Sequence, residues 1–298
     1  MLALPHTLKY KLGYWHGCFT AMASPCELLI DTDDALLAKH LLNLAMAETQ
    51  RIEQKYSRYL AHNVMFDINH SDGHKVQVDP ETHRLLTFAQ TCFELSDGLF
   101  DLTSGILRKA WAFNAQAVFP TPAQISELLK FIGWQYINVD ATSITLPAGF
   151  ELDFGGIGKE YAVDAAAKLC SQEAPEVSVL VNFGGDIQVT RPRSKAPYWH
   201  VGIEDPKNNY QSQAMVQIAS GGLATSGDSR RFIINQGKRY GHILNPKTGY
   251  PVSNAPRSVT VATDYCVHAG LLATMALLQG KDAEEFLQAQ VVKYWCFW

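Results

Sequence analysis

The sequence predicts an α+β fold, in which helices and antiparallel or mixed strands form separate clusters. Two stretches in the first hundred residues have the apolar spacing of helices, whereas the middle of the chain is rich in short β-type runs. These runs do not alternate strictly with helices, as a doubly wound parallel sheet would require. The chain has 298 residues, of which 47% are hydrophobic, so it can bury a large core as one large domain or two small ones.

Three segments carry the signals of capped helices. Residues 33–56 begin with two aspartates and continue with leucine, alanine and isoleucine at helical spacing. A second helix is expected to follow the Asp-Pro pair at 79–80 and to end at the Asp-Gly pair at 97–98. A third is expected from Thr121-Pro122 to about Phe131. The segment GLFDLTSG, which follows the second helix, resembles a loop.

Short strands are expected at residues 137–139, 143–146 and 177–183, where β-branched and apolar residues gather. Residues 191–213 are punctuated by proline and asparagine, which predicts an exposed excursion around a short strand. The aromatic tail at 294–298 is expected to be a buried final strand, and the alternative is a surface for a partner.

The bulk properties exclude several classes of protein. A net charge of −4 and a pI near 6.2 provide no basic surface for nucleic acid. No apolar stretch is long enough for a membrane span, and the first 30 residues contain neither a secretory signal nor a lipobox. Six scattered cysteines have no zinc spacing and indicate isolated thiols. We therefore expect a cytoplasmic protein.

The segment ELDFGGIGKEYAVDAAAKL places three glycines between a β-type run that ends at Asp153 and a helical stripe of alanines. A strand, a glycine loop and a helix N-terminus together form an anion site, because backbone N–H groups and the helix dipole both favour negative charge. Lys159 would lie in the first helical turn, where a cation is unfavourable unless an anion is near. The spacing matches neither a P-loop nor a Rossmann fingerprint. The simpler alternative is a tight turn that needs glycine for its backbone.

Three further segments combine small and polar residues: VNFGGDI, SGGLATSGDSRRF and GKRYGHILNPKTGYP. In the second of these, Thr225, Ser226 and Asp228 lie on a glycine-flanked turn that suits a phosphate or ribose, or alternatively a capped hairpin. In the third, His242 has the pKa range that a general base needs at neutral pH, although a lone histidine is more often structural.

Taken in order, these segments resemble the FAD:protein FMN transferase family, the ApbE-type flavin transferases. The resemblance covers about residues 20–280. Its N-terminal motifs are TAMASP, KYSRYLAHNV, INHSDG and ELSDGLFDLTSGIL followed by WAF. Its later motifs are DFGGIGKEYAVD, VNFGGDI, ATSGD, GHILNPKTGYPVS, SVTVAT and the LLATMALLQG helix. The resemblance implies a single domain over residues 1–298, with two lobes and an FAD-binding cleft between them.

The resemblance also implies an activity: a Thr or Ser hydroxyl of an acceptor flavoprotein attacks the FMN phosphorus of FAD, and AMP leaves. Magnesium is implied at the pyrophosphate, which suits phosphoryl transfer because that chemistry depends on positioning and charge neutralisation. His242 matches the family's catalytic base, and Gly156 and Thr274 match its metal ligands. The positions that match FAD contacts are Met22, Tyr59, Leu99, Phe100, Asp101, Asp153, Lys159, Thr225 and Ile243.

The sequence departs from the family pattern at the metal. The last helix usually carries an aspartate four residues before the threonine, but here Gly270 takes that place. Losing a carboxylate should weaken a magnesium site, and His268 is a poor substitute. Glu160 for a usual glycine and Asn245 for a usual aspartate are smaller departures.

These departures leave several possibilities open. Phosphates, Gly156, Thr274 and waters hold the metal, or another carboxylate such as Asp264 or Asp153 moves in, or the enzyme is impaired. The alternatives to an active transferase are a non-catalytic FAD-binding protein and a magnesium-dependent FAD pyrophosphatase.

Overall fold

The structure is a computed structural model that describes residues 5–113, 119–206, 208–228 and 231–298. An eight-stranded sheet forms its centre, in the order β1-β2-β3-β7-β8-β11-β14-β15, and every neighbouring pair is antiparallel. Its strands are β1 (Thr7–Lys11), β2 (Tyr14–Ala21), β3 (Ser24–Ile30), β7 (Val179–Phe183), β8 (Asp186–Val189), β11 (Gly221–Gly227), β14 (Ser258–Thr263) and β15 (Lys293–Phe297).

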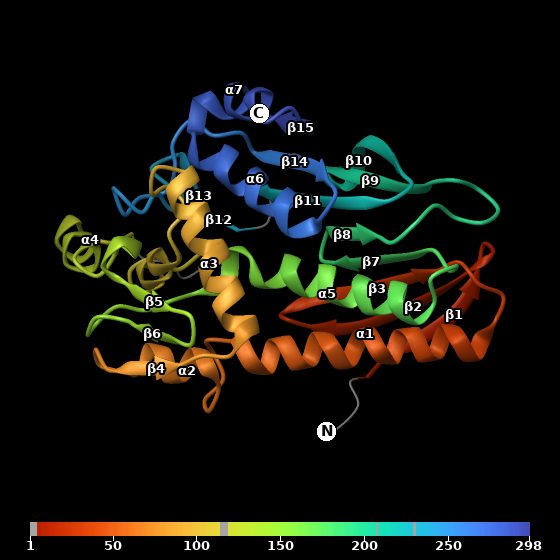
Figure 1. Ribbon diagram of the computed structural model, residues 1–298. Helices are drawn as coiled ribbons and strands as arrows, with labels where there is room; N and C mark the ends of the chain where they lie inside the picture. The colour runs from red at the N-terminus through yellow and green to blue at the C-terminus, as the bar shows by residue number, and fades with distance from the viewer. Residues whose placement is uncertain (1–4, 114–118, 207, 229–230) are drawn as a thin grey trace.

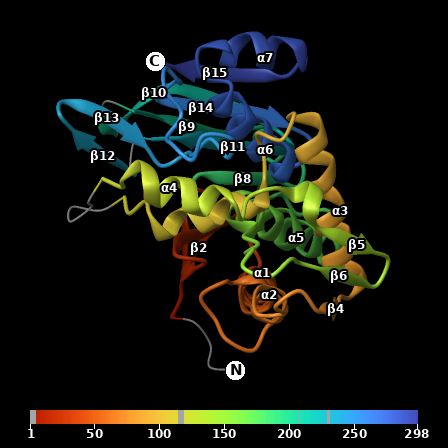
Figure 2. The same ribbon diagram turned by 90° about the vertical axis from the view of Figure 1, so that its left-hand side faces the viewer.

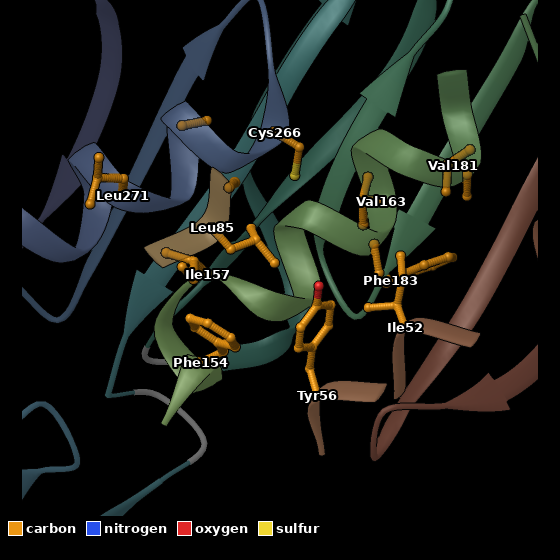
Figure 3. Close-up of a cluster of buried hydrophobic side chains, with 14 of the residues drawn as sticks. Ile52, Tyr56, Leu85, Phe154, Ile157, Val163, Val181, Phe183, Cys266 and Leu271 are labelled. Atoms are coloured by element: carbon orange, nitrogen blue, oxygen red, sulfur yellow. The ribbon is translucent and has the colours of Figure 1, made fainter. Parts of the chain in front are cut away.

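Three helices, α1 (Ala35–Tyr56), α5 (Gly158–Glu173) and α6 (Cys266–Leu278), cover one face of this sheet (Figure 1). The middle helix α5 contacts both of its neighbours and strands β7 and β8. Its buried stripe consists mostly of small residues, so the backbones approach closely and the thiol of Cys170 lies 3.8 Å from the carbonyl oxygen of Leu41. Figure 3 shows the resulting core, in which the Tyr56 ring of α1 stands edge-on to Phe154, with ring centroids 5.4 Å apart.

Part of the opposite face of the sheet is covered by a two-stranded hairpin of β9 (Trp199–Asp205) and β10 (Asn208–Ile218). Trp199 and Ile218 pack there against Leu180 and Leu223 of the main sheet. The expected short strand is present as β9, and residues 191–198 are exposed or half-buried, but the segment also begins a second strand, β10, which pairs with β9, and Trp199 is buried.

The remaining elements lie around the C-terminal end of α1, and Figure 2 shows them from a second side. They include helices α2 (Val64–Asn69), α3 (Pro80–Leu95) and α4 (Pro122–Leu129), and the 3-10 helix η1 (Leu102–Lys109). Two smaller sheets, β4-β6-β5 and β12-β13, complete this region. Their strands are β4 (Lys75–Gln77), β5 (Asn138–Asp140), β6 (Ser143–Thr145), β12 (Phe232–Asn235) and β13 (Lys238–Gly241).

The chain ends with α7 (Ala283–Ala289) and β15, and short 3-10 turns connect other elements. These turns are η2 (Trp134–Tyr136), η3 (Phe154–Gly156) and η4 (Gly280–Asp282). The expected final strand is confirmed as β15, which pairs with β14 at the edge of the main sheet. Most of its side chains are only half-buried, because one side of an edge strand has no neighbouring strand.

The three predicted helices are confirmed with their caps. Asp34 accepts from the backbone N–H groups of Leu36 and Leu37, and Asp79 accepts from that of Thr82. The expected loop at GLFDLTSG is instead half helical, since Asp101 caps η1 by accepting from Thr103. No helix in the described part of the chain has the length and apolar character that crossing a membrane requires.

Candidate functional site

The glycine loop runs from Asp153 through η3 into the first turn of α5. Asp153 Oδ1 accepts from the backbone N–H of Gly155 at 2.9 Å, and its carboxylate pairs with Arg58. A Cβ at Gly105 would come within 2.5 Å of the Asp153 Cβ, so position 105 needs glycine to let η1 approach the loop. Arg58 also lies 4.8 Å from the ring centroid of Tyr59 and donates to its hydroxyl. The structure thus brings two predicted residues, Asp153 and Tyr59, together through an arginine that the sequence analysis missed.

Lys159 lies in the first turn of α5, as predicted, and its ammonium meets a buried carboxylate. The Nζ atom is 2.5 Å from Oδ2 of Asp186, which begins β8 and is 3% exposed. Burial lowers the pKa of Lys159, but the negative charges of Asp186 and Glu160 together with the hydrogen bond to Asp186 outweigh it, so the net shift is upward. The anion that a first-turn lysine requires is therefore supplied within the protein.

Glu160, the next residue, points into the interior against α6. Its side chain fills the space beside Gly270: a Cβ at 270 would lie 2.7 Å from the Glu160 Cγ and 3.0 Å from its Oε1. Glu160 is 9% exposed, and its Oε2 atom has no hydrogen-bond partner. Burial, together with the charge of Asp186, raises the pKa of Glu160 to about 8.

Hydroxyl groups from β11, β14 and α6 form two pairs on opposite faces of the sheet, because side chains alternate along β11: Ala224 packs under the helices, whereas Leu223 packs against the β9-β10 hairpin. Ser226 and Thr274 share a hydrogen bond of 2.7 Å, and Thr225 shares one of the same length with Thr260. The backbone N–H of Thr225 also donates to Asp186 Oδ1 at 3.4 Å. Because Thr274 follows Gly270 by one helical turn, its hydroxyl and the space that Glu160 fills lie on the same face of α6.

The donor set of this cluster suits a hard cation. Carboxylate, hydroxyl and carbonyl oxygens are the ligands that magnesium prefers, and Glu160 offers an unpartnered carboxylate oxygen. Gly156 lies in η3, which contacts α6, and its Cα faces the ring of Phe100 so closely that a Cβ there would be 3.2 Å from it. The structure therefore fits the metal that the family resemblance implies.

His242 directly follows β13. The residue before it, Gly241, lies close to Asp228, which directly follows β11, the strand that carries Thr225. Asp228, just beyond the end of β11, binds Arg239 and Arg257, and a Cβ at Gly241 would come within 2.8 Å of its Cβ. Burial lowers the pKa of His242, and the charge of Arg231 adds to that effect. Its Nδ1 atom is buried without a partner. A neutral imidazole with a free ring nitrogen is suited to accept a proton.

The other predicted FAD contacts lie on several elements of the fold. Met22 lies in the turn between β2 and β3 at a φ of +50°, and its N–H donates to Glu53. Leu99 and Phe100 lead into η1, and Ile243 packs against the main core. Asp101 is already occupied by protein donors: Thr103 contacts its Oδ1, and the backbone N–H of Trp134 donates to its Oδ2 at 3.0 Å. Its carboxylate borders a hollow of about 480 Å³ between α3, the start of η2 and Lys247.

Of the predicted residues, Lys159 and Thr225 meet at Asp186, the first through its ammonium and the second through its backbone N–H, and Thr274 binds Ser226, the neighbour of Thr225. Gly156 lies in η3, which contacts α6, and His242 follows Gly241, which lies close to Asp228. The other carboxylates considered for the metal are placed elsewhere, since Asp153 pairs with Arg58 and Asp264 is exposed. Sequence reasoning missed Asp186, although an acidic residue directly after a glycine pair at the end of an apolar strand is a usable signal. Ser229 and Arg230, which follow the ATSGD motif in the segment SGGLATSGDSRRF, lie outside the described residues.

Comparisons with known proteins show the family and the fold of the chain. The model of the ApbE family matches residues 22–296. The FAD:protein FMN transferase of Klebsiella pneumoniae is 30% identical over 85% of this chain and 79% of its own. The crystal structure of the ApbE protein of Thermotoga maritima, 28% identical, superposes with a TM-score of 0.87 over 95% of this chain and 94% of its own.

A second solved structure, the apo flavinyl transferase ApbE of Pseudomonas stutzeri, has 22% identity. It superposes with a TM-score of 0.81 over 99% of this chain and 92% of that one, and supports the same fold. The predicted α+β fold with a helix-flanked antiparallel sheet is thereby confirmed. From the match of its sequence over residues 22–296 and of its fold over nearly the whole chain, this protein belongs to the ApbE family.

Proposed function

We propose that this protein is an FAD:protein FMN transferase, which moves the FMN half of FAD to a Thr or Ser hydroxyl of an acceptor flavoprotein. The observation that carries the proposal is the cluster of Lys159, Asp186, Glu160 and Thr274 at the glycine loop of an ApbE-family chain. Such a cluster suits phosphoryl transfer, because it provides fixed charges and a glycine backbone rather than a covalent nucleophile.

Different residues of the site have different roles in the reaction. The glycine loop and Lys159 bind the pyrophosphate of FAD and balance its negative charge. His242 accepts the proton of the acceptor hydroxyl, whose oxygen forms a bond to the FMN phosphorus while the bond from that phosphorus to the AMP oxygen breaks. AMP leaves with the bonding electron pair, and FMN remains attached to the acceptor through a phosphoester.

We propose magnesium as the metal of the reaction, with the Gly156 carbonyl and the Thr274 hydroxyl among its ligands. When bound, the ion supplies positive charge to the pyrophosphate, which phosphoryl transfer requires. The remaining FAD contacts are proposed at Met22, Tyr59, Leu99, Phe100, Asp101, Asp153, Thr225 and Ile243; among these, Asp101 lines the hollow, and Asp153 and Phe100 contact the glycine loop.

We also propose that the protein acts in a reducing compartment, with the cytoplasm as the expected location. All six cysteines are free thiols, and four of them are buried. Buried unpaired thiols are typical of such compartments.

The experiment is to incubate the protein with FAD, magnesium and a purified acceptor flavoprotein, and to measure flavin fluorescence on a denaturing gel. A fluorescent acceptor band supports the proposal. The matched controls are an acceptor whose target Thr or Ser is changed to Val or Ala, and His242→Ala enzyme. The expected result is loss of the band in both controls.

Two other outcomes would overturn the proposal. Release of free FMN and AMP without a labelled acceptor would identify an FAD pyrophosphatase, in which water replaces the acceptor hydroxyl. Unchanged FAD that remains bound to the protein would identify a flavin-binding protein without catalysis.

A further inference from the structure

Glu160, in the first turn of α5, has a buried carboxylate that no partner on the described part of that helix compensates. It makes no salt bridge among the described residues, and its Oε2 atom has no hydrogen-bond partner, although it is nine-tenths buried. Leaving a carboxylate in this state is costly for a protein unless a cation or a donor meets it. Lys159, the neighbouring cation, is directed to Asp186 instead.

The side chain of Glu160 occupies a defined space. It lies against the one position of α6 that has no side chain, since a Cβ at Gly270 would come within 2.7 Å of its Cγ, 3.0 Å of its Oε1 and 3.1 Å of its Cδ. The Glu160 carboxylate therefore stands where the side chain of a residue at 270 would stand, one helical turn before Thr274. Thr274 in turn is fixed by its hydrogen bond to Ser226.

We propose that Glu160 supplies the carboxylate of the metal site, so that α5 provides from one side the ligand that α6 lacks at Gly270. This inference rests on the proposed function, because it concerns the metal of that site. The metal site then has its carboxylate, which comes from position 160 on α5 instead of position 270 on the facing helix α6. Neither Asp153 nor Asp264 is needed for this role, since the first pairs with Arg58 and the second is exposed.

The test measures metal binding directly, with Mn²⁺ as the probe and electron paramagnetic resonance of free Mn²⁺ as the readout. Titrations are made on the full chain with and without FAD. Glu160→Gln keeps the shape of the side chain and removes its charge. We expect it to weaken Mn²⁺ binding by at least about tenfold, because charged oxygen ligands supply most of the affinity of such sites.

A reciprocal pair of variants separates the role in metal binding from a role in packing. Glu160→Gly alone removes the carboxylate and should weaken Mn²⁺ binding as Glu160→Gln does. Glu160→Gly combined with Gly270→Asp returns a carboxylate to the same space from the other helix. We expect this double variant to bind Mn²⁺ within about threefold of the unaltered protein, given ligands of the same charge. Circular dichroism melting curves establish which variants are folded.

The outcomes for the metal ligand and for the enzyme activity are distinguishable. Wild-type Mn²⁺ affinity in Glu160→Gln, no recovery in a folded double variant, or no Mn²⁺ binding by the unaltered protein would each overturn the inference. If the unaltered protein binds Mn²⁺ through Glu160 but labels no acceptor, the proposed function fails and the metal ligand stands. If it labels the acceptor and Glu160→Gln binds Mn²⁺ normally, the function stands and the inference fails.

Discussion

At the scale of single residues, the site is held together by charges that lie far apart in the sequence. Lys159 is neutralised by Asp186 at the start of β8, and Gly241, the residue before His242, lies close to Asp228. Each of these residues therefore has a structural partner as well as a proposed role toward FAD. Substitutions at this site should change stability and activity in separable ways.

Lys159→Ala is expected to destabilise the free protein, because it leaves the buried carboxylate of Asp186 without its cation. Breaking a buried ion pair from one side costs about 3–5 kcal/mol. Urea unfolding without FAD measures the loss, and adding Asp186→Asn should recover most of it. Lys195→Ala, which breaks the exposed pair with Asp33, is the matched control and should change stability by less than about 1 kcal/mol. Equal small losses in both variants would contradict a structural role for Lys159.

The pH dependence should follow His242. Burial lowers its pKa below the usual value of 6.5, so the imidazole stays neutral to a lower pH than in the unfolded chain. The rate of FMN transfer should therefore stay constant from pH 8 down to about 6.5 and decline only below it. In that acidic range the unfolded state binds more protons than the folded state, so stability also falls as the pH decreases. A single-turnover rate that already declines above pH 7 would exclude His242 as the base.

At the scale of elements, the contact between α5 and α6 depends on glycine at one position. Gly270→Ala in an ordinary helix would stabilise the protein by about 1 kcal/mol. Here the new methyl group would meet Glu160, so we expect a loss of about 1–3 kcal/mol instead. In a Glu160→Gly background the same substitution should become stabilising. Denaturant unfolding of the four proteins gives this coupling, and additive effects would show that the two side chains do not compete for one space.

The elements differ in how far their sequence predicts them. Helices α1, α3 and α4 were predicted because their caps, Asp34, Asp79 and Thr121, act within three residues of the helix start. Only one short strand was predicted in the segment that forms the β9-β10 hairpin, since Trp199 is buried by packing against other strands such as β7, which carries Leu180. The candidate site was predicted as a set of motifs, but the pairing of Glu160 with Gly270 was not. It depends on how two helices face each other, which no local pattern contains.

At the scale of the whole molecule, the site joins elements from across the fold. Residues from α5, β8, β11 and α6 meet in it, so a ligand bound there connects the central sheet to the helical layer (Figure 1). The similarity to FAD:protein FMN transferases favours a pyrophosphate over a single phosphate as the ligand. Binding of such a ligand should therefore stabilise the entire fold rather than one loop.

FAD should raise the melting temperature more than FMN at equal concentration. A ligand at roughly 100 times its Kd stabilises the folded state by about 2.7 kcal/mol. FMN carries one phosphate and cannot contact both the glycine loop and a second phosphate position, so its affinity should be lower. Differential scanning fluorimetry with FAD, FMN and AMP compares the three. Equal shifts for FAD and FMN would mean that the pyrophosphate is not what the site recognises.

The close approach of Glu160 to position 270 also limits how a chain with glycine there can be converted into one with the aspartate that the family resemblance implies. A protein with both acidic side chains would place two carboxylates in one space, whereas a protein with glycine at both positions would fold with a small void and bind metal weakly. Of these two possible intermediates, the protein with glycine at both positions is the less harmful, because it still folds. An evolutionary route between the two arrangements thus passes through a weakened enzyme rather than an unfolded one. Positions 160 and 270 must accordingly be read together when ancestral or related sequences are sorted into active and inactive members.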